Sequence, residues 1–332
     1  MAQDPRIGRE ILPLPDIPVQ ADPALHAKDT TAPPIQPLRP PEGAPNVLIV
    51  LIDDMGFGCT STFGGPVEMP TFDRLADNGL RYNRFHTTAL CSPTRQALLT
   101  GRNHHSAEMG SVGEVATSMP GNTSVRPNSV ATVAEMLKLN GYNTSAFGKM
   151  HQTPVWETSV SGPFDRWPTG DGFEKFWGFV AGETNQWEPT LFEGTTPTEP
   201  RATADEGYHV TEEQVDQAIA WVKAQKTMTP DKPFFMYMSY GATHAPHHAP
   251  PEWIDKYRGR FDRGWDAVRA ETLAKQIEMG IVPEGTELTD PPPGVQPWDE
   301  LSDAQRTVGA RLMETYAGFA EHTDFHTGRL VD

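Results

Sequence analysis

The hydrophobic residues of this chain follow two alternating patterns, short unbroken runs and helical repeats. The run NVLIVLIDD begins at residue 46 and ends in two aspartates, a pattern that predicts a strand buried on both faces. Three more segments are predicted to be strands: LRYNRFHT from residue 80, NTSAFGK from residue 143 and PFFMYMSY from residue 233.

Segments with a helical pattern lie between these runs. TFDRLADNG predicts a short helix that Thr71 caps and Gly79 ends, and SVATVAEMLKLNG predicts another between Ser129 and Gly141. Strands that alternate with helices in this way predict an α/β fold, in which a mixed sheet is sandwiched between helices.

The last segment, from about Ser302, predicts a further helix that continues to Asp332. Its apolar residues at helical spacing are Val308, Leu312, Tyr316 and Phe319. An α/β pattern would continue with at least one more strand, so we expect the chain to be truncated. We also expect a polypeptide of this extent to be inactive and poorly soluble, with those four side chains partly exposed.

The chain divides into two parts by composition. Residues 1–45 contain eleven prolines and little periodicity, which predicts an extended arm, whereas residues 46–332 carry the α/β pattern of one domain. Within that domain, residues 156 to about 208 are rich in Trp, Gly, Pro and Thr and are predicted to be a long irregular insertion.

Charge and composition argue against two classes of protein, those that bind nucleic acid and those that span a membrane. Lys and Arg total 27 against 44 for Asp and Glu, and the formal charge of -17 would repel nucleic acid. The longest apolar run, VLIVLI, is far shorter than the roughly 20 residues of a membrane span, and no targeting segment is evident. The expectation is a cytoplasmic protein without a membrane or nucleic-acid partner.

Cys91, one of two cysteines, lies where a helix begins. In the segment CSPTRQALLTG, Ser92 is suited to cap the helix, Pro93 to its first position and Gly101 to its end. Free N–H groups and the helix dipole favour negative charge at such an N-terminus, and Arg95 lies within one turn. The segment therefore predicts an anion site, although a lone cysteine is more often a small buried hydrophobe.

Asp53 and Asp54 end the first predicted strand. Two adjacent carboxylates beside an anion site repel each other unless a cation lies between them. A hard divalent ion with oxygen ligands would satisfy both. Taken alone, the tetrad Asp-Asp-x-Gly is more often a turn or a helix cap.

Five motifs resemble those of the type I sulfatases, in that family's order. CSPTRQALLTGR, from Cys91, resembles the first family signature, and GYNTSAFGKMH, from Gly141, resembles the second. The segments LIDDMG, GKMH and THAPHH also match, and Phe147 departs from the smaller residue that is usual before Gly-Lys. The resemblance implies a fold like that of alkaline phosphatase, with residues 46–332 as the N-terminal part of the sulfatase catalytic domain.

The resemblance implies a role for each matching residue. Cys91 would be oxidised by a formylglycine-generating enzyme, which reads Pro93 and Arg95, and the hydrated aldehyde would attack the sulfur of a small sulfate ester. Lys149 would bind the sulfate and the nucleophile oxygen, and His151 would take a proton when sulfate leaves. His244 would contact the substrate oxygen, and either His244 or a lysine beyond residue 332 would protonate the leaving group.

The resemblance also implies a metal. Asp53, Asp54 and the modified Cys91 would be ligands of Ca²⁺, with Mg²⁺ as the alternative. The Asp-Asn pair that the family uses later in its sequence has no counterpart here, because the Asp-Asn pair at residues 77 and 78 lies too early.

The other histidines are expected to lie outside the site. His247 and His248 are predicted to be loop residues, because their spacing beside two prolines is not that of a helical ligand pair. His104 and His105 are predicted to lie at the rim. A last cluster, near the end of the chain, is expected to form an exposed polar helix face; it consists of His322, Asp324 and His326.

Two alternative functions stay open. A phosphonate monoester or phosphodiester hydrolase of the same superfamily shares the Cys-x-Pro-x-Arg site, and extra cations around the pocket would favour it. A non-catalytic sulfatase-like fragment is the other, favoured by the missing ligands and opposed by the complete cluster of matching residues.

Overall fold

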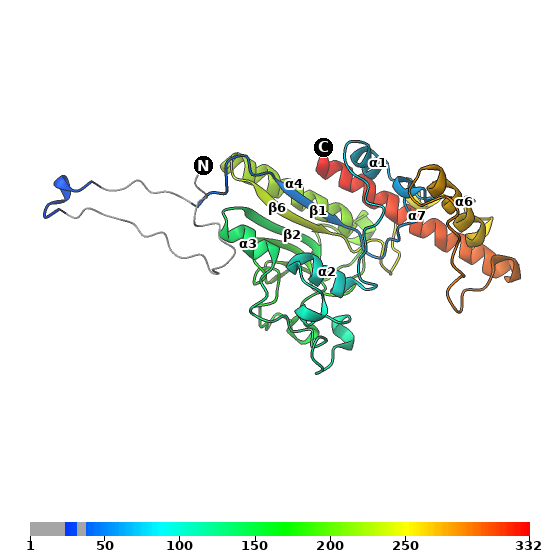
Figure 1. Ribbon diagram of the computed structural model, residues 1–332, viewed down its shortest axis with the longest axis horizontal. Helices are drawn as coiled ribbons and strands as arrows, with labels where there is room; N and C mark the ends of the chain where they lie inside the picture. The colour runs from blue at the N-terminus through cyan, green and yellow to red at the C-terminus, as the bar shows by residue number, and fades with distance from the viewer. Residues whose placement is uncertain (1–23, 32–37) are drawn as a thin grey trace.

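The computed structural model describes residues 24–31 and 38–332 (Figure 1). Most of the predicted proline-rich arm, residues 1–45, lies outside the described residues. The part of the arm that is described includes one short 3₁₀ turn, Ala27–Asp29, whose side chains are exposed. The first strand begins at Val47.

In the described part of the chain, six strands form one mixed sheet in the order β1-β6-β2-β3-β4-β5. Their bounds are β1 Val47–Leu51, β2 Asn143–Lys149, β3 Lys175–Phe179, β4 Leu191–Glu193, β5 Thr196–Thr198 and β6 Phe234–Ser239. The first four in this order, β1, β6, β2 and β3, are parallel neighbours, whereas β4 and β5 continue the sheet antiparallel. The parallel strands therefore bring their carboxyl ends to the same edge.

Helices cover both faces of this sheet, as predicted (Figure 1). The described residues form seven α-helices: α1 Pro70–Asp77, α2 Cys91–Thr100, α3 Val133–Leu139, α4 Val210–Met228, α5 Pro251–Asp255, α6 Gly264–Glu278 and α7 Asp303–Val331. One core cluster joins α4 and α7 to one sheet face, and a second joins α2 and α3 to the other. None of the helices in the described ranges combines the length and apolarity that crossing a bilayer requires.

The alternation of side chains along β6 explains why both faces are covered. Met236 and Met238 point into the cluster under α4, whereas Phe235 and Tyr237 point into the cluster under α3. All four are almost fully buried. A strand apolar on both faces needs a helix layer on each side.

Two of the predicted strand features are wrong. Residues 80–87, all of them described, form no strand, and Leu80, Tyr82 and Phe85 are 80%, 66% and 71% exposed. β1 is only half-buried, because it lies at the edge of the described sheet and pairs with β6 alone. An apolar run identifies a strand but does not specify its place in the sheet.

The predicted insertion, residues 156–208, is not irregular throughout. It contains β3, β4 and β5, and Phe176 of β3 and Phe192 of β4 belong to the core cluster under α3. Trp167, for example, is fully buried and donates a hydrogen bond to the backbone oxygen of Glu157 at 2.6 Å. The strands of this segment are short and lie among turn residues, so the sequence pattern does not reveal them.

Two helix caps also differ from the prediction. The helix with Cys91 begins at Cys91 itself, with Leu90 in the capping position, and Ser92 is a buried residue of its first turn. Thr71 lies inside α1, and the Asp324 carboxylate of α7 accepts hydrogen bonds from the backbone N–H groups of Thr71 and Phe72. A side chain 253 residues away from Thr71 thus caps α1, which local sequence could not reveal.

The prediction that His322, Asp324 and His326 form an exposed face is wrong. All three are buried, because α7 packs with this face against α1, α4 and α5. Of the apolar residues predicted to be partly exposed, Val308 and Leu312 are exposed and Phe319 is fully buried against the sheet.

Burial of these histidines predicts a pH-dependent stability. Burial lowers the pKa of His209 and of His322 to about 3, and it also lowers the pKa of His326. The unfolded chain, with ordinary histidine pKa values, binds protons first as the pH falls below about 6.5. The free energy of unfolding should therefore fall on acidification, by up to about 1.4 kcal/mol per pH unit for each histidine.

Urea denaturation at about pH 7 and about pH 5.5 tests this. The variant His326→Gln should lose about 1 kcal/mol less than the wild type on acidification, because one of the three histidines no longer takes up a proton on unfolding. His247→Gln, at an exposed position, is the matched control. Equal losses in all three proteins would contradict the assignment.

Candidate active site

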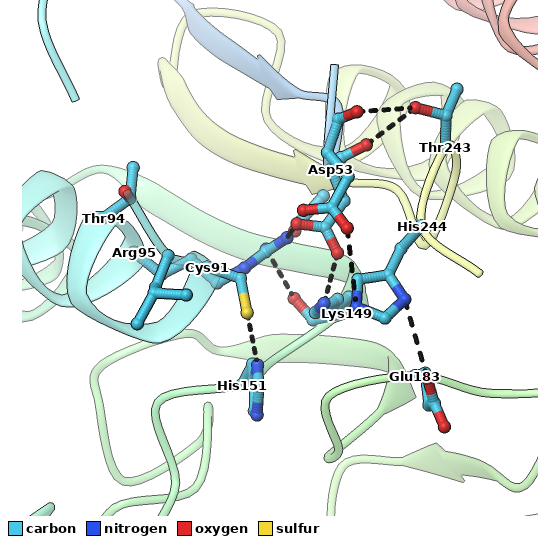
Figure 2. Close-up of polar contacts among 12 residues, drawn as sticks. Asp53, Cys91, Thr94, Arg95, Lys149, His151, Glu183, Thr243 and His244 are labelled. Atoms are coloured by element: carbon cyan, nitrogen blue, oxygen red, sulfur yellow. Dashed lines mark hydrogen bonds and ion pairs between the residues drawn. The ribbon is translucent and has the colours of Figure 1, made fainter. Parts of the chain in front are cut away.

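Three parallel strands deliver polar residues to one edge of the sheet. Asp53 and Asp54 follow β1, Lys149 ends β2, and Thr243 and His244 follow β6. Since β6 lies between β1 and β2, these residues meet where the strands end, in a crevice typical of ligand sites in α/β proteins. Figure 2 shows the side chains of Asp53, Lys149 and His244 pointing toward one another.

Helix α2 adds two more predicted residues to this edge. Cys91 is its first residue and half-buried, and Arg95, one turn later, is almost completely buried. Arg95 donates hydrogen bonds to the hydroxyl of Ser239 and to the backbone oxygen of Lys149, at 3.3 Å for the latter. The guanidinium is thereby fixed against the ends of β2 and β6.

The buried carboxylate of Asp53 joins the two cations. It pairs with Arg95 at 3.1 Å and accepts a hydrogen bond from Lys149, whose side chain is fully buried. Burial alone would raise the pKa of Asp53, but Arg95 and Lys149 hold it below its ordinary value. Lys149 is therefore a buried member of this cluster and not a solvated surface lysine.

The cluster contains one carboxylate, that of Asp53, and two cationic side chains, those of Arg95 and Lys149. Burial and the neighbouring Arg95 lower the pKa of Lys149, whereas Asp53 opposes this shift. In addition, the Nε of Arg95 has no hydrogen-bond partner among the described residues. An excess of buried positive charge suits an anionic ligand.

His151 connects the cysteine to Glu114, a residue that the sequence pattern does not indicate. Its Nδ1 lies 3.0 Å from Sγ of Cys91, and its Nε2 lies 2.9 Å from the carboxylate of Glu114. Burial would raise the pKa of Glu114, but the hydrogen bond with His151 keeps it below its ordinary value. An ionised carboxylate only accepts, so Nε2 of His151 donates to Glu114 and, in the neutral ring, Nδ1 faces Cys91 as an acceptor.

Burial, together with the charge of Lys149, lowers the pKa of His151, against the opposing effect of Glu114. The ring is therefore neutral near pH 7, with a free electron pair beside Cys91. This arrangement can accept a proton from a group at position 91.

His244 lies on the opposite side of the site. Its Nε2 is 3.6 Å from the carboxylate of Asp54, and its Nδ1 is 3.6 Å from that of Glu183 and 2.6 Å from the backbone oxygen of Ala245. The carbonyl can only accept, so Nδ1 carries a hydrogen and Nε2 is directed toward Asp54. Thr243 fixes this turn by donating to the backbone oxygen of Asp53 at 2.9 Å.

A cavity of about 400 Å³ is lined by four of the predicted residues, Asp53, Asp54, Cys91 and Arg95. The carboxylates of Asp53 and Asp54 and a ring nitrogen of His244 lie within 4.8 Å of one another. Two carboxylates on one cavity fit a hard divalent cation, with Asp53 shared between that ion and its two cationic partners. The donor set is thus compatible with the predicted metal.

Two of the remaining histidines are loop residues, as predicted. His247 and His248 lie in the loop after β6, and His248 accepts a hydrogen bond from the backbone of Gln186 at 3.4 Å. His104 and His105 contact each other, with ring centroids 4.3 Å apart.

Three residues of the site, Glu114, Ser239 and Glu183, are not indicated by the sequence motifs. Glu114 lies in the loop segment SVGEVAT, whose composition gives no chemical signal, and it reaches His151 only through the tertiary fold. Ser239 has one local signal, because it ends the strand that precedes the predicted His244.

The Asp53 cluster predicts an asymmetric effect of two neighbouring substitutions. Asp53→Asn leaves Arg95 and Lys149 buried without a counterion and should lower the free energy of unfolding by about 3–5 kcal/mol. Asp54→Asn, at an exposed side chain, should change it by less than about 0.5 kcal/mol without added metal. Urea denaturation of both variants in the presence of a chelator measures the difference, and similar effects of the two would contradict the proposed role of Asp53.

Comparison with known proteins gives a consistent result. The family model described as Sulfatase matches residues 45–332. An uncharacterized sulfatase of Schizosaccharomyces pombe is 31% identical over 318 aligned residues, covering 87% of this chain and 54% of that protein. An arylsulfatase of Klebsiella aerogenes is 29% identical over 302 aligned residues, covering 87% of this chain and 62% of that protein.

A solved structure of a Bacteroides fragilis protein described as a sulfatase, yidJ, has a similar fold. Its TM-score is 0.59 at 19% sequence identity, and the match covers 91% of this chain and 59% of that one. The chain spans about half the length of the curated relatives it matches. Because the family model matches nearly all of the α/β domain, this chain belongs to the sulfatase family.

Proposed function

We propose that the protein hydrolyses sulfate esters, with small aryl sulfates as substrates, through a formylglycine made from Cys91. The observation that carries this proposal is the position of Cys91, at the N-terminus of α2, 3.0 Å from a neutral histidine and beside two buried cations. Family membership supports sulfate ester hydrolysis, and the arylsulfatase from Klebsiella aerogenes supports the aryl class.

Arg95 and Lys149 bind the sulfate group in this proposal. They compensate negative charge that develops on the sulfate oxygens and on the nucleophile. Because both cations are already held in place by Asp53, little reorganisation is needed when the anion binds.

Formylglycine, in its hydrated form, supplies a nucleophilic hydroxyl and a second hydroxyl through which sulfate can be released. A formylglycine-generating enzyme is therefore a required partner. His151 acts as the general base at this position. Its Nδ1 accepts a proton from the group at residue 91, and Glu114 stabilises the resulting cation. In this proposal His244, whose Nε2 lies 3.6 Å from the carboxylate of Asp54, contacts the ester oxygen of the leaving group.

Asp53 and Asp54 would hold Ca²⁺, or Mg²⁺ as the alternative, together with the modified residue 91. The ion would supply additional positive charge for the sulfate and the nucleophile. The carboxylates of Asp53 and Asp54 could then both stay ionised beside each other.

The first test is turnover. The full-length protein is coexpressed with a formylglycine-generating enzyme. We expect it to hydrolyse 4-nitrophenyl sulfate faster than a phenyl phosphonate monoester. Cys91→Ala should reduce sulfate turnover by about a thousandfold or more, because the nucleophile is lost.

In Cys91→Ser, a hydroxyl is present but has no second hydroxyl for release, so sulfate should remain on the protein. This would be visible in the intact mass. Absence of sulfate hydrolysis at full conversion of residue 91 with added Ca²⁺ would contradict the proposal, and faster phosphonate hydrolysis would replace it with the alternative.

The second test concerns the metal and does not depend on activity. Ca²⁺ should raise the melting temperature of the wild-type protein, because a ligand of the folded state stabilises it by mass action. Asp54→Asn should lose most of this increase, whereas Glu68→Gln, at an exposed carboxylate elsewhere, should keep it. An equal increase in all three proteins, or none in any, would exclude Asp54 as a ligand.

A further inference from the structure

A second group of potential ligands lies between α4 and α7, two helices that pack side by side on one face of the sheet (Figure 1). His322 and His326 are four residues apart on α7 and therefore share one helix face. Glu212, in the first turn of α4, faces them. We call these three residues the α4/α7 cluster.

The distances within this cluster are close to those of a tetrahedral metal site. Nε2 of His322 lies 3.6 Å, and Nε2 of His326 lies 3.9 Å, from the same carboxylate oxygen of Glu212. The ligand atoms offered by the three residues all lie within 4.8 Å of one another. Ligands bound at zinc distances are roughly 3.3–3.5 Å apart, so small side-chain movements would complete the site.

The burial of His322 also points to a missing partner. Its side chain has no solvent exposure, and neither ring nitrogen has a hydrogen-bond partner among the described residues. A buried polar ring without partners is destabilising, so such a ring normally contacts a further group. Glu212 is too far from it for a hydrogen bond and is the right distance for a shared ion.

The hydrogen bonds of the neighbouring His209 show whether its ring nitrogens could also bind a metal. The ring of His209 also contacts His322, with centroids 4.6 Å apart. However, Nδ1 of His209 accepts from the backbone N–H of Thr211, and Nε2 donates to the backbone oxygen of His248. His209 therefore packs against the cluster without offering a ligand atom.

We propose that Glu212, His322 and His326 bind a divalent transition metal ion, with Zn²⁺ as the preferred ion, which links α7 to α4. Two histidines separated by one helical turn and a carboxylate form a donor set suited to zinc, unlike the carboxylates at Asp53 and Asp54 that suit a hard cation. Burial lowers the pKa of His322 to about 3, so this ring is neutral near pH 7, as a metal ligand must be.

Arg329 makes the proposal more specific. Its Nη1 donates to Nδ1 of His326 at 2.9 Å, which places the proton of the metal-free neutral ring on Nε2. When Nε2 binds a metal, the proton moves to Nδ1 and Arg329 must leave that nitrogen. Arg329 keeps a second contact in this case, its ion pair with Asp216.

Cobalt binding measures the site directly, because Co²⁺ replaces Zn²⁺ and absorbs visible light strongly in tetrahedral sites. The purified protein, without a histidine tag and stripped with a chelator, is titrated with Co²⁺ and then with Zn²⁺. We expect one equivalent of Co²⁺ with a tetrahedral spectrum, displaced by Zn²⁺. Zn²⁺ should also raise the melting temperature.

Five variants locate the site. Glu212→Gln, at a half-exposed position that tolerates substitution, and His326→Gln should each weaken Co²⁺ binding by about tenfold or more. Asp54→Asn and His247→Gln, outside the cluster, should bind as the wild type does. Arg329→Met should bind more tightly, because the competing donor and a nearby positive charge are gone.

Two results would overturn the proposal. One is the absence of a tetrahedral Co²⁺ spectrum in a folded wild-type protein, which would indicate that water occupies the space beside His322. The other is binding that Glu212→Gln and His326→Gln leave unchanged, which would place the metal elsewhere.

Discussion

The candidate site depends on one buried ion-pair cluster, in which the carboxylate of Asp53 holds Arg95 and Lys149. These residues come from the end of β1, from the first turns of α2 and from the end of β2. The carboxylate offsets the desolvation of two cations that would otherwise be very unfavourable inside the protein. The cluster of one carboxylate and two cations keeps one positive charge in excess. Cys91 and His151 lie beside this charge.

Much of the fold and of this cluster is predictable from the amino-acid sequence because the signals are local. The segments of β1, β2 and β6 are identifiable as strands from their residues, and the residues that end parallel strands meet at one edge. Asp53, Lys149 and His244 are therefore identifiable from their positions along the chain, and the motif around Cys91 connects α2 to them. The structure places all of them around one cavity or in direct contact with its lining.

The features that the sequence does not reveal depend on contacts between distant segments. Glu114 orients His151 from a loop without chemical signal, and Asp324 caps α1 from the far end of the chain. The polar face of α7 is predicted to be exposed, because polarity alone cannot show that Glu212 and His209 lie opposite it. Residues 80–87 have strand composition but no neighbouring strand in the described structure, so their apolar side chains stay exposed.

The Asp53 cluster and His151 surround the position of a nucleophile that we propose is formed from Cys91. The most direct measurement is the mass of the proteolytic peptide that contains residue 91, from protein coexpressed with a formylglycine-generating enzyme. Conversion of the thiol to an aldehyde predicts a mass about 18 Da lower than that of the cysteine peptide, outside the usual products of thiol oxidation. An unmodified cysteine peptide, from cells in which a control sulfatase is fully converted, would contradict the account.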